Sequence, residues 1–363
     1  MRAETGSSLA GLIDRELRLP EIDGEACVHA QIEQAHCSAC VEACPRGAWV
    51  LDEDALGLDT EACDGCGLCI PDCPTGALHI HMPWVVRLLG GNPIALFACE
   101  HSEARVDDAT LPCIHALGIR QLLLLYSAGI RYLLLSTGDC QGCDRCAEDR
   151  LGTRLGQLNL ALKERHHAPM KALERSPGIF VSLYRSDEVI PHGTRLGRRE
   201  FLRGGTERLR EQLAVLDPLN RPDARRLPPG ELLPDAAGEA FHWPWVPVID
   251  EAHCNGCDAC AKLCPTGALS VQTGDQEKPP CYHLVPAACT GCGICSSACE
   301  QKAVTVHAWE VPVKDRVVLA EHTCRACGNR FHLPEENPDA GETLCPICRQ
   351  TNHASRLFQV LQD

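Results

Sequence analysis

The fold is decided by Cys254-Asn-Gly-Cys257-Asp-Ala-Cys260-Ala-Lys-Leu-Cys264-Pro265 and its counterpart Cys289-Thr-Gly-Cys292-Gly-Ile-Cys295-Ser-Ser-Ala-Cys299. In each run, three closely spaced thiolates can face one side of a [4Fe–4S] cubane. The fourth lies about one helical turn further on and reaches the cluster held by the other run. The spacing therefore predicts two cubanes with crossed ligands: Cys254, Cys257, Cys260 and Cys299 on one, and Cys289, Cys292, Cys295 and Cys264 on the other.

This doubled pattern resembles the two-cluster ferredoxin module. Accidental disulfides or zinc knuckles would not require the same spacing twice, nor Pro265 directly after the fourth cysteine. Polar breaks followed by β-branched residues come after each run and predict a short strand there. We therefore expect each half to contain a short strand, a cluster-binding loop and one helical turn.

The composition indicates a metal protein of a reducing compartment. The chain has 363 residues, room for two to four small domains, and carries 26 cysteines but only 4% aromatic residues. Acidic residues at Glu4, Asp14 and Glu16 interrupt any apolar signal-peptide core. The apolar run 122–135 contains Arg131 and is too short to cross a bilayer. We expect a cytoplasmic location, no membrane insertion, and cysteines that bind metal rather than form disulfides.

The formal net charge of −15 makes the surface acidic before any cluster is counted. Such a surface repels nucleic-acid phosphates, so nucleic acid is not expected as a partner. It is compatible with docking on a basic patch of a redox partner.

A second ferredoxin-like module, with one ligand missing, comes earlier in the chain. Its complete run contains Cys63, Cys66, Cys69 and Cys73; the run before it contains only Cys37, Cys40 and Cys44. Gln34 stands where a first cysteine is expected. With crossed ligands, one site has the full set Cys63, Cys66, Cys69 and Cys44. The other site has Cys37, Cys40 and Cys73, and lacks one ligand.

Three solutions are open for this incomplete site. We favour Cys27 as the fourth ligand, because ten residues suffice for the chain to loop back from Cys37. Alternatively, three thiolates hold a [3Fe–4S] cluster, or a cubane with His36 or Gln34 as its fourth ligand. The third alternative is an empty site. A ligand other than a thiolate would change the reduction potential.

Alternating strands and helices are predicted between the two modules. Buried strands are expected at 94–98, 132–136 and 179–184, and helices at 114–128 and 151–166. This alternation is typical of a small α/β layer with a parallel sheet. Ligand-bearing loops lie at the carboxyl ends of such strands.

Five cysteines follow these strands and are expected at one edge of the sheet: Cys99, Cys113, Cys140, Cys143 and Cys146. The segments Phe97-Ala-Cys99-Glu and Gly138-Asp-Cys140-Gln-Gly-Cys143, with Cys113 between them, resemble the iron–sulfur delta subunit of methyl-viologen-reducing hydrogenase. The resemblance covers about a hundred residues and implies a [2Fe–2S] cluster held by Cys99, Cys113, Cys140 and Cys143. The chain departs from that family where Ser102 replaces an expected cysteine and Cys146 is added. A [4Fe–4S] cluster, zinc or bare thiols therefore remain alternatives.

The C-terminal segment carries two Cys-x-x-Cys pairs, at Cys324 and Cys327 and at Cys345 and Cys348. Four thiolates in this pattern favour a structural zinc ion in a ribbon that is too small to fold on its core alone. A rubredoxin-type iron is the alternative. Three histidines of this segment are expected at the surface: His322, His332 and His353. Cys281 matches no ligand position and is expected to be a free thiol.

Together these features predict an α+β multidomain chain. The expected parts are a lead-in at 1–26 with a short helix at 9–17, a first ferredoxin-like module at 27–83, an α/β iron–sulfur domain at 84–215, a Pro-rich linker at 216–247, a second ferredoxin-like module at 248–310 and a zinc ribbon at 311–363. In the linker, Trp243 and Trp245 are expected to cover a domain joint. The predicted cofactors are four [4Fe–4S] clusters (or three and one [3Fe–4S]), one [2Fe–2S] cluster and one zinc ion.

The predicted function is single-electron transfer as a subunit of a larger redox complex. No Gly-x-Gly-x-x-Gly motif follows a strand and no phosphate loop is present, so two-electron chemistry is expected on another subunit. The delta-subunit resemblance implies a hydrogenase, formate dehydrogenase or heterodisulfide-reductase-like partner. Two alternatives are a thiol or sulfur reductase fed by the clusters, and an iron–sulfur assembly factor.

Overall fold

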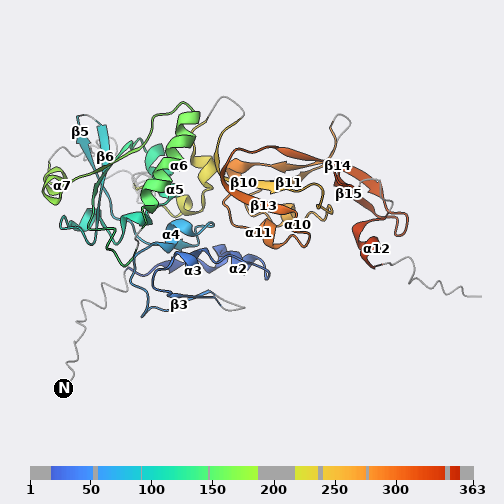
Figure 1. Cartoon of the computed structure of the whole chain (residues 1–363), viewed down its shortest axis with the longest axis horizontal. Helices are drawn as coiled ribbons and strands as arrows, with labels where there is room; N and C mark the ends of the chain where they lie inside the picture. The colour runs from blue at the N-terminus through green and yellow to red at the C-terminus, as the bar shows by residue number, and fades with distance from the viewer. Residues whose placement is uncertain are drawn as a thin grey trace, which may run out of the picture. The chain divides into compact units, whose positions relative to one another are not determined.

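The computed structural model describes residues 18–51, 56–90, 92–145, 148–186, 217–235, 240–274, 278–339 and 344–351 (Figure 1). The chain forms two compact units. The first contains Met1–Glu33 and Cys37–Phe241, and the second contains Gln34–His36 and His242–Asp363. Within the described residues, no helix is both long and apolar enough to cross a membrane. The predicted helix at 9–17 lies outside them.

The first unit begins with short strands and one-turn helices around the cysteine runs. The strands are β1 (Glu21–Ile22), β2 (Trp49–Leu51), β3 (Leu56–Leu58) and β4 (Leu78–His79), and the helices are η1 (Gly24–Ala26), α2 (Val28–Gln31), α3 (Ala39–Ala43) and α4 (Cys69–Asp72). β1 pairs with β4 and β2 with β3, both antiparallel, while α3 packs against α4. The strands predicted after the two cysteine runs are confirmed by β2 and β4.

A five-stranded mixed sheet forms the rest of this unit. Its strands are β5 (Val85–Leu89), β6 (Asn92–Cys99), β7 (Thr110–Leu111), β8 (Tyr132–Ser136) and β9 (Lys171–Glu174). The order is β5-β6-β8-β9, with the short β7 beside β6. β5 is antiparallel to β6, whereas the pairings of β6 with β7, β6 with β8 and β8 with β9 are parallel. The predicted parallel layer is thus present, with one antiparallel edge strand.

The helices of the sheet are η2 (Asp107–Ala109), η3 (Ile114–Ala116), α5 (Ile119–Ser127), α6 (Arg150–Glu164) and α7 (Pro177–Tyr184). The single helix predicted at 114–128 is divided into η3 and α5 by Gly118. A Cβ at Gly118 would lie 2.4 Å from the Cβ of Pro71, so only glycine allows this approach to α4. The Gly118 N–H also donates to Gln121 Oε1 at 3.1 Å, which caps α5.

The strand predicted at 179–184 is wrong, because this segment is the helix α7. Ser176 occupies the N-cap position and Pro177 the first turn, where proline's fixed φ suits a helix. Phe180 is completely buried against β6 and β8 residues, and Val181, Leu183 and Tyr184 flank the same core. The third parallel strand is instead β9, whose mostly exposed side chains gave no apolar pattern to detect.

The second unit repeats the arrangement of short strands around cysteine helices. Its strands are β10 (Trp243–Ile249), β11 (Leu269–Gln272), β12 (Cys281–Leu284), β13 (Val304–Glu310), β14 (Arg316–Thr323) and β15 (Arg330–Pro334), and its helices are α10 (Ala259–Lys262), η6 (Pro286–Ala288), α11 (Ile294–Ser297) and α12 (Pro346–Thr351). β10 pairs with β13, and a four-stranded sheet has the order β11-β12-β14-β15. Tyr282, Leu269 and Val304 lie in the core between them. The strands predicted after both cysteine runs are confirmed by β11 and β13.

The Pro-rich segment divides between the two units. Residues 217–235, with η4 (Asp223–Arg226) and η5 (Pro229–Leu232), lie along the first unit, where Trp84 Nε1 donates to Asp217 Oδ1 at 2.8 Å. From Trp243 onward the chain is not linker but strand β10. Trp245 packs its ring on Gly291, so it covers a cluster-binding loop of its own unit.

Candidate metal centres

The three complete cysteine runs share one loop shape. In each, two residues take φ between 64° and 76°: Gly65 and Gly67, Gly256 and Asp258, and Gly291 and Gly293. Left-handed residues between right-handed neighbours turn successive backbone N–H groups toward the same side and form a concave anion site. An iron–sulfur cluster with its thiolates is such an anion, so these loops fit the group that the cysteine spacing predicts.

The incomplete run lacks this shape. None of residues 34–40 takes a positive φ, and Ser38, at the position of Gly67, has φ −118°. The loop therefore departs from the other three in backbone as well as in its missing cysteine.

In the second unit, the thiols of the first predicted cluster lie together. Burial raises the pKa of Cys260 to about 12. Smaller contributions come from the neighbouring thiols of Cys254, Cys295, Cys257 and Cys299. Burial likewise raises the pKa of Cys254 to about 11, with Cys257 and Cys299 contributing. Cys299 thus lies close enough to the run 254–260 to act on its thiols, and crossed ligation stays a prediction.

The second set of this unit is also brought together. Burial raises the pKa of Cys289 to about 12, with contributions from Cys295, Cys292 and Cys264. Cys264 contributes to the raised pKa of Cys292 and Cys295 as well. Trp245 and Cys264 both pack against the buried cluster of Ala268, Ala288 and Cys289, so the Trp245 side chain lies beside this site.

The complete cysteine run of the first unit brings its thiols together. Burial raises the pKa of Cys69, and Cys66 and Cys63 contribute, which places the three thiols of the complete run together. Cys44 Sγ accepts from the Ala48 N–H at 3.3 Å, and Cys299 Sγ accepts in the same way from Ala303. N–H···S bonds of this kind tune cluster potentials.

The three thiols of the incomplete site are close neighbours. Burial raises the pKa of Cys40 to about 12, and the charges of Cys37 and Cys73 contribute to this rise. Cys27 is half-buried directly before α2, and His29 Nε2 lies 2.8 Å from the Cys37 carbonyl oxygen. The segment after Cys27 therefore folds back on the incomplete run; ligation by Cys27 stays a prediction.

Four of the five cysteines of the α/β sheet line one small hollow: Cys99, Cys113, Cys140 and Cys143. Cys99 ends β6 and Cys113 precedes η3, and both are buried. The Gly138 N–H donates to Cys99 Sγ at 3.2 Å. Cys146 lies outside the described residues.

A buried imidazole supports a sulfur-rich group in this hollow. His115 lines it and is 3% exposed, and its Nδ1 accepts from the Leu151 N–H at 3.2 Å. The ring proton is therefore on Nε2, which is buried and has no partner among the described residues. Burial lowers the pKa of His115, so the ring is neutral. A buried N–H without an acceptor costs about 1–3 kcal/mol, and cluster sulfur is an acceptor that fits.

Ser102, where a cysteine was expected, has a structural role. It is buried, its Oγ lies 2.8 Å from Ser136 Oγ, and the Ala104 N–H donates to it. Its hydroxyl thus stabilises the turn after β6.

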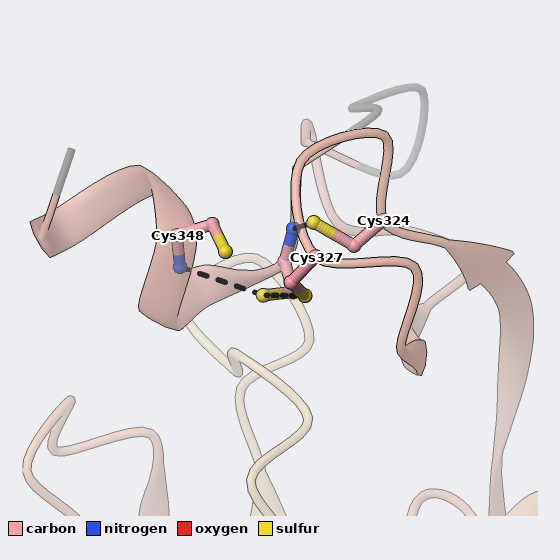
Figure 2. Close-up of side chains that lie close together, drawn as sticks. Cys324, Cys327 and Cys348 are labelled. Carbon is pink, nitrogen blue, oxygen red and sulfur yellow. Dashed lines mark hydrogen bonds between the residues drawn. The ribbon is translucent and has the colours of Figure 1, made fainter. Parts of the chain in front are cut away.

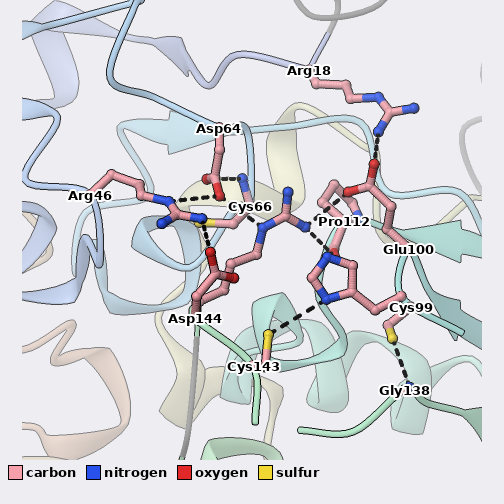
Figure 3. A network of polar contacts seen from close by, with 12 residues as sticks. Arg18, Arg46, Asp64, Cys66, Cys99, Glu100, Pro112, Gly138, Cys143 and Asp144 are labelled. Atoms are coloured by element: carbon pink, nitrogen blue, oxygen red, sulfur yellow. Dashed lines mark hydrogen bonds and ion pairs between the residues drawn. The ribbon is translucent and has the colours of Figure 1, made fainter.

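Arg145 connects the first ferredoxin-like module to the five-stranded sheet. The cysteine pattern alone does not reveal this residue. It donates to Asp64 Oδ2 at 2.8 Å, to Glu100 Oε2 at 2.9 Å and to the Pro112 carbonyl at 3.0 Å. These partners stand beside the cysteines at 63, 99 and 113. Figure 3 shows Asp64 and Glu100 in this network, with Cys66 and Cys99 next to them.

The first module and the sheet region also meet through buried cysteines. Cys66, Leu68 and Cys113 form one apolar cluster, with exposures of 7%, 0% and 7%. Cys66 belongs to the complete run of the first module and Cys113 to the hollow beside the sheet. Predicted ligands of two different clusters therefore pack in one buried cluster.

The C-terminal thiols form a single compact site. The ligand atoms of Cys324, Cys327, Cys345 and Cys348 all lie within 4.8 Å of one another, and three of these residues are buried (Figure 2). The N–H of Cys345 donates to Cys324 Sγ at 3.3 Å, and that of Cys348 to Cys345 Sγ at 3.4 Å. The Cys345 N–H holds the pKa of Cys324 at about 6, whereas burial raises that of Cys348 to about 12. Four converging thiols fit one metal ion.

The hairpin that carries this site also packs against the cluster loop at 254–260. His332 Nε2 lies 2.7 Å from Asp258 Oδ1, and Asn337 Nδ2 donates to the Cys254 carbonyl at 2.9 Å. The surface position predicted for His332 is therefore wrong: its side chain is 20% exposed and paired. His353 lies outside the described residues. Cys281, on β12, is a buried free thiol, as expected.

Comparison with known proteins agrees with these geometries. A family model described as a 4Fe–4S dicluster domain matches residues 35–77, and one described as a 4Fe–4S binding domain matches residues 247–270. The chain is also similar to a ferredoxin of Rickettsia felis, with 36% identity over 52 residues, which are 13% of this chain and 48% of that ferredoxin. The chain thus spans about half the length of this relative. It contains 4Fe–4S binding domains of the ferredoxin type.

Proposed function

We propose that this chain is an electron-transfer subunit that passes single electrons between a redox enzyme and its acceptor. The observation that carries the proposal is the buried cluster of Cys66, Leu68 and Cys113. It joins a predicted ligand of a ferredoxin-type cubane to a predicted ligand of the cluster beside the sheet. A subunit that conducts electrons needs such close neighbours, whereas a scaffold for isolated metal ions does not.

The full proposed complement is four cubanes or three and a [3Fe–4S] cluster, one [2Fe–2S] cluster and one zinc ion. Iron–sulfur clusters exchange one electron at a time, while the protein sets their potential through charge, hydrogen bonds and solvent exposure. The chemistry of the substrate is then assigned to another subunit, such as a hydrogenase, formate dehydrogenase or heterodisulfide-reductase-like enzyme, in a hetero-oligomeric complex.

The chain's own residues prepare the junction between the first module and the sheet. Leu68 excludes water between the two cysteines, because it is completely buried. Arg145 pairs with Asp64 and Glu100, and these carboxylates are also bound by Arg46 and Arg18, so the acids next to the proposed clusters are balanced by positive charge.

The junction is tested by electron paramagnetic resonance (EPR) of the fully reduced protein, prepared without oxygen. If the clusters are neighbours, the signal of the cluster at Cys113 is broadened when the first module is also reduced. Removing the complete cubane with Cys63→Ser and Cys66→Ser restores a sharp signal. Cys281→Ser, which changes a buried cysteine that is no predicted ligand, is the control and leaves the broadening unchanged.

A signal from the Cys113 cluster that is equally sharp with and without the first module contradicts the junction. A thiol reductase is distinguished in the same preparation. In that case the reduced protein has Cys140 and Cys143 open to alkylation and turns over a disulfide.

A further inference from the structure

Arg120 places a positive charge deep inside the first unit. It lies in the first turn of α5 and is only 7% exposed. Its Nε donates to the Leu227 carbonyl at 2.9 Å and its Nη2 to the Pro74 carbonyl at 3.0 Å. Both acceptors are neutral, so neither balances the charge of the guanidinium.

Two other arginines of this unit, Arg145 and Arg154, are paired with acids. Arg145 contacts Asp64 and Glu100, and Arg154 contacts Asp72 at 2.8 Å. Arg120 makes no ion pair with any carboxylate of the described residues. A buried cation costs several kcal/mol unless an anion lies near it.

One group that Arg120 contacts comes directly after Cys73 in the chain. Pro74, whose carbonyl accepts from Arg120, follows Cys73 directly, and a Cβ on Gly76 would lie 3.4 Å from Arg120 Nη1. Gly76 has φ +69°, and the same Cβ would lie 2.0 Å from the Arg225 carbonyl oxygen. The guanidinium therefore lies against the segment 74–76. Burial lowers the pKa of Arg120, and the charge of Cys73 acts in the opposite direction.

We propose that the incomplete site of Cys37, Cys40 and Cys73 holds an anionic iron–sulfur cluster, and that Arg120 is its fixed counter-charge. Reduction adds one electron and one negative charge to this cluster, and a nearby cation in a poorly hydrated site favours that state. Arg120 therefore makes this cluster easier to reduce than it would be without the charge. The inference rests on the proposed electron-transfer function and names the residue that sets the reduction potential of one cluster.

The direction of electron flow within the first module follows from this asymmetry. Arg145, which binds Asp64 in the complete run, already pairs with two carboxylates. Arg120 keeps its charge for the incomplete site. Electrons that enter from the cluster at Cys113 are thus drawn through the complete cubane toward Cys73.

The test is an EPR-monitored redox titration of the full chain with a low-potential one-electron donor and mediators. The cluster at Cys73 is assigned by its loss in Cys37→Ser. In Arg120→Gln we expect the reduction equilibrium of that cluster to weaken about tenfold, which for one electron is a fall of about 59 mV. Arg120→Lys, which keeps the charge, should stay near the wild-type potential.

Arg165→Gln is the matched control. Arg165 is also a buried arginine of this unit, 4% exposed, but its guanidinium stacks over Phe241 instead of facing a cysteine. It should leave every potential unchanged. Selective loss of the Cys73 cluster in Arg120→Gln, with retention in Arg120→Lys, also supports the counter-charge.

An unchanged potential in Arg120→Gln overturns the inference, as does equal loss of the cluster in both variants, because a merely structural role predicts that. Wild-type iron at the level of an empty incomplete site overturns it as well. None of these results affects the broadening of the Cys113 signal, so failure here is distinct from failure of the proposed function.

Discussion

At the scale of single residues, the most informative group is the buried imidazole of His115. Its Nδ1 is occupied by the Leu151 N–H, which leaves Nε2–H as a donor beside four cysteines. Hydrogen bonds to cluster sulfur stabilise the reduced, more negative state. We therefore expect His115 to tune the potential of the proposed cluster through this N–H rather than to ligate it.

Replacing His115 with leucine should lower the potential of the cluster at Cys113, on the order of a tenfold change in its reduction equilibrium. The measurement is a redox titration followed by the EPR signal of that cluster, with the first-module cubanes as internal reference. His115→Gln keeps an N–H donor, so the potential of this cluster should fall less in that variant. A shift of the same size in every cluster would show that the substitution acts on the whole fold instead.

The carboxylates bound to Arg145 predict a flat pH response. Burial alone would raise the pKa of Asp64 and Glu100, but the hydrogen bonds and charge of Arg145 hold both below their ordinary values of 3.8 and 4.5. A depressed carboxyl pKa contributes stability that is fully present above the ordinary value and is lost as the pH falls through the depressed one. Both pairs are therefore intact throughout the neutral range.

We expect the EPR broadening at the junction to be constant between about pH 6 and pH 8, because Asp64 and Glu100 stay ionised there. The check is the reduced spectrum across this range in the wild type and in Asp64→Asn. A titration within the range that disappears in Asp64→Asn would contradict this assignment.

At the scale of elements, the cysteine loops were predictable and their neighbours were not. Spacing within a run is local, so the sequence alone indicated crossed ligation, which stays a prediction. Arg145 and Asp64 are 81 residues apart, and Arg120 and Pro74 are 46 apart, so no local pattern joins them. The strand prediction at 179–184 was wrong because β-branched and aromatic residues can fill one buried face of a helix as well as a strand.

The contact between β15 and the loop at Cys254 gives a matched pair of glycine substitutions. Gly256 and Gly267 have φ +70° and +71°, so alanine costs each about 1–2 kcal/mol of backbone strain. At Gly256 the new Cβ would also lie 1.9 Å from the His332 carbonyl oxygen, whereas at Gly267 nothing lies within 4 Å. We expect Gly256→Ala to lose the cluster of Cys254, Cys257, Cys260 and Cys299, and Gly267→Ala to keep it.

Iron content and the cubane EPR signals measure this difference. Equal iron in the two variants would mean that β15 does not support the cluster loop.

At the scale of the whole molecule, the two compact units should respond separately to loss of the C-terminal metal. The ribbon hairpin continues the sheet of the second unit, because β14 pairs with β12. Removing the metal, by a chelator or by Cys345→Ser, should therefore lower the thermal stability of the second unit and loosen its clusters. The clusters of the first unit should remain, as followed by iron content and visible absorbance during heating. Simultaneous loss from both units would contradict this separation.

The class of the protein followed from cysteine spacing and charge, which are properties of the sequence itself. The buried contact of Cys66, Leu68 and Cys113 did not, because it depends on how β6, η3 and the run at Cys63 pack. The buried charge of Arg120 beside the segment 74–76 was not predictable either, because only the packing of α5 reveals it.

The central claim is that the thiols hold inorganic iron and sulfide. It is tested most directly by iron, sulfide and zinc analysis of protein purified without oxygen. The ligand sets predict about 18 iron and one zinc per chain, or about 17 iron if the incomplete site holds a three-iron cluster. A colourless protein that contains only zinc, or whose cysteines are paired in disulfides, would contradict the account.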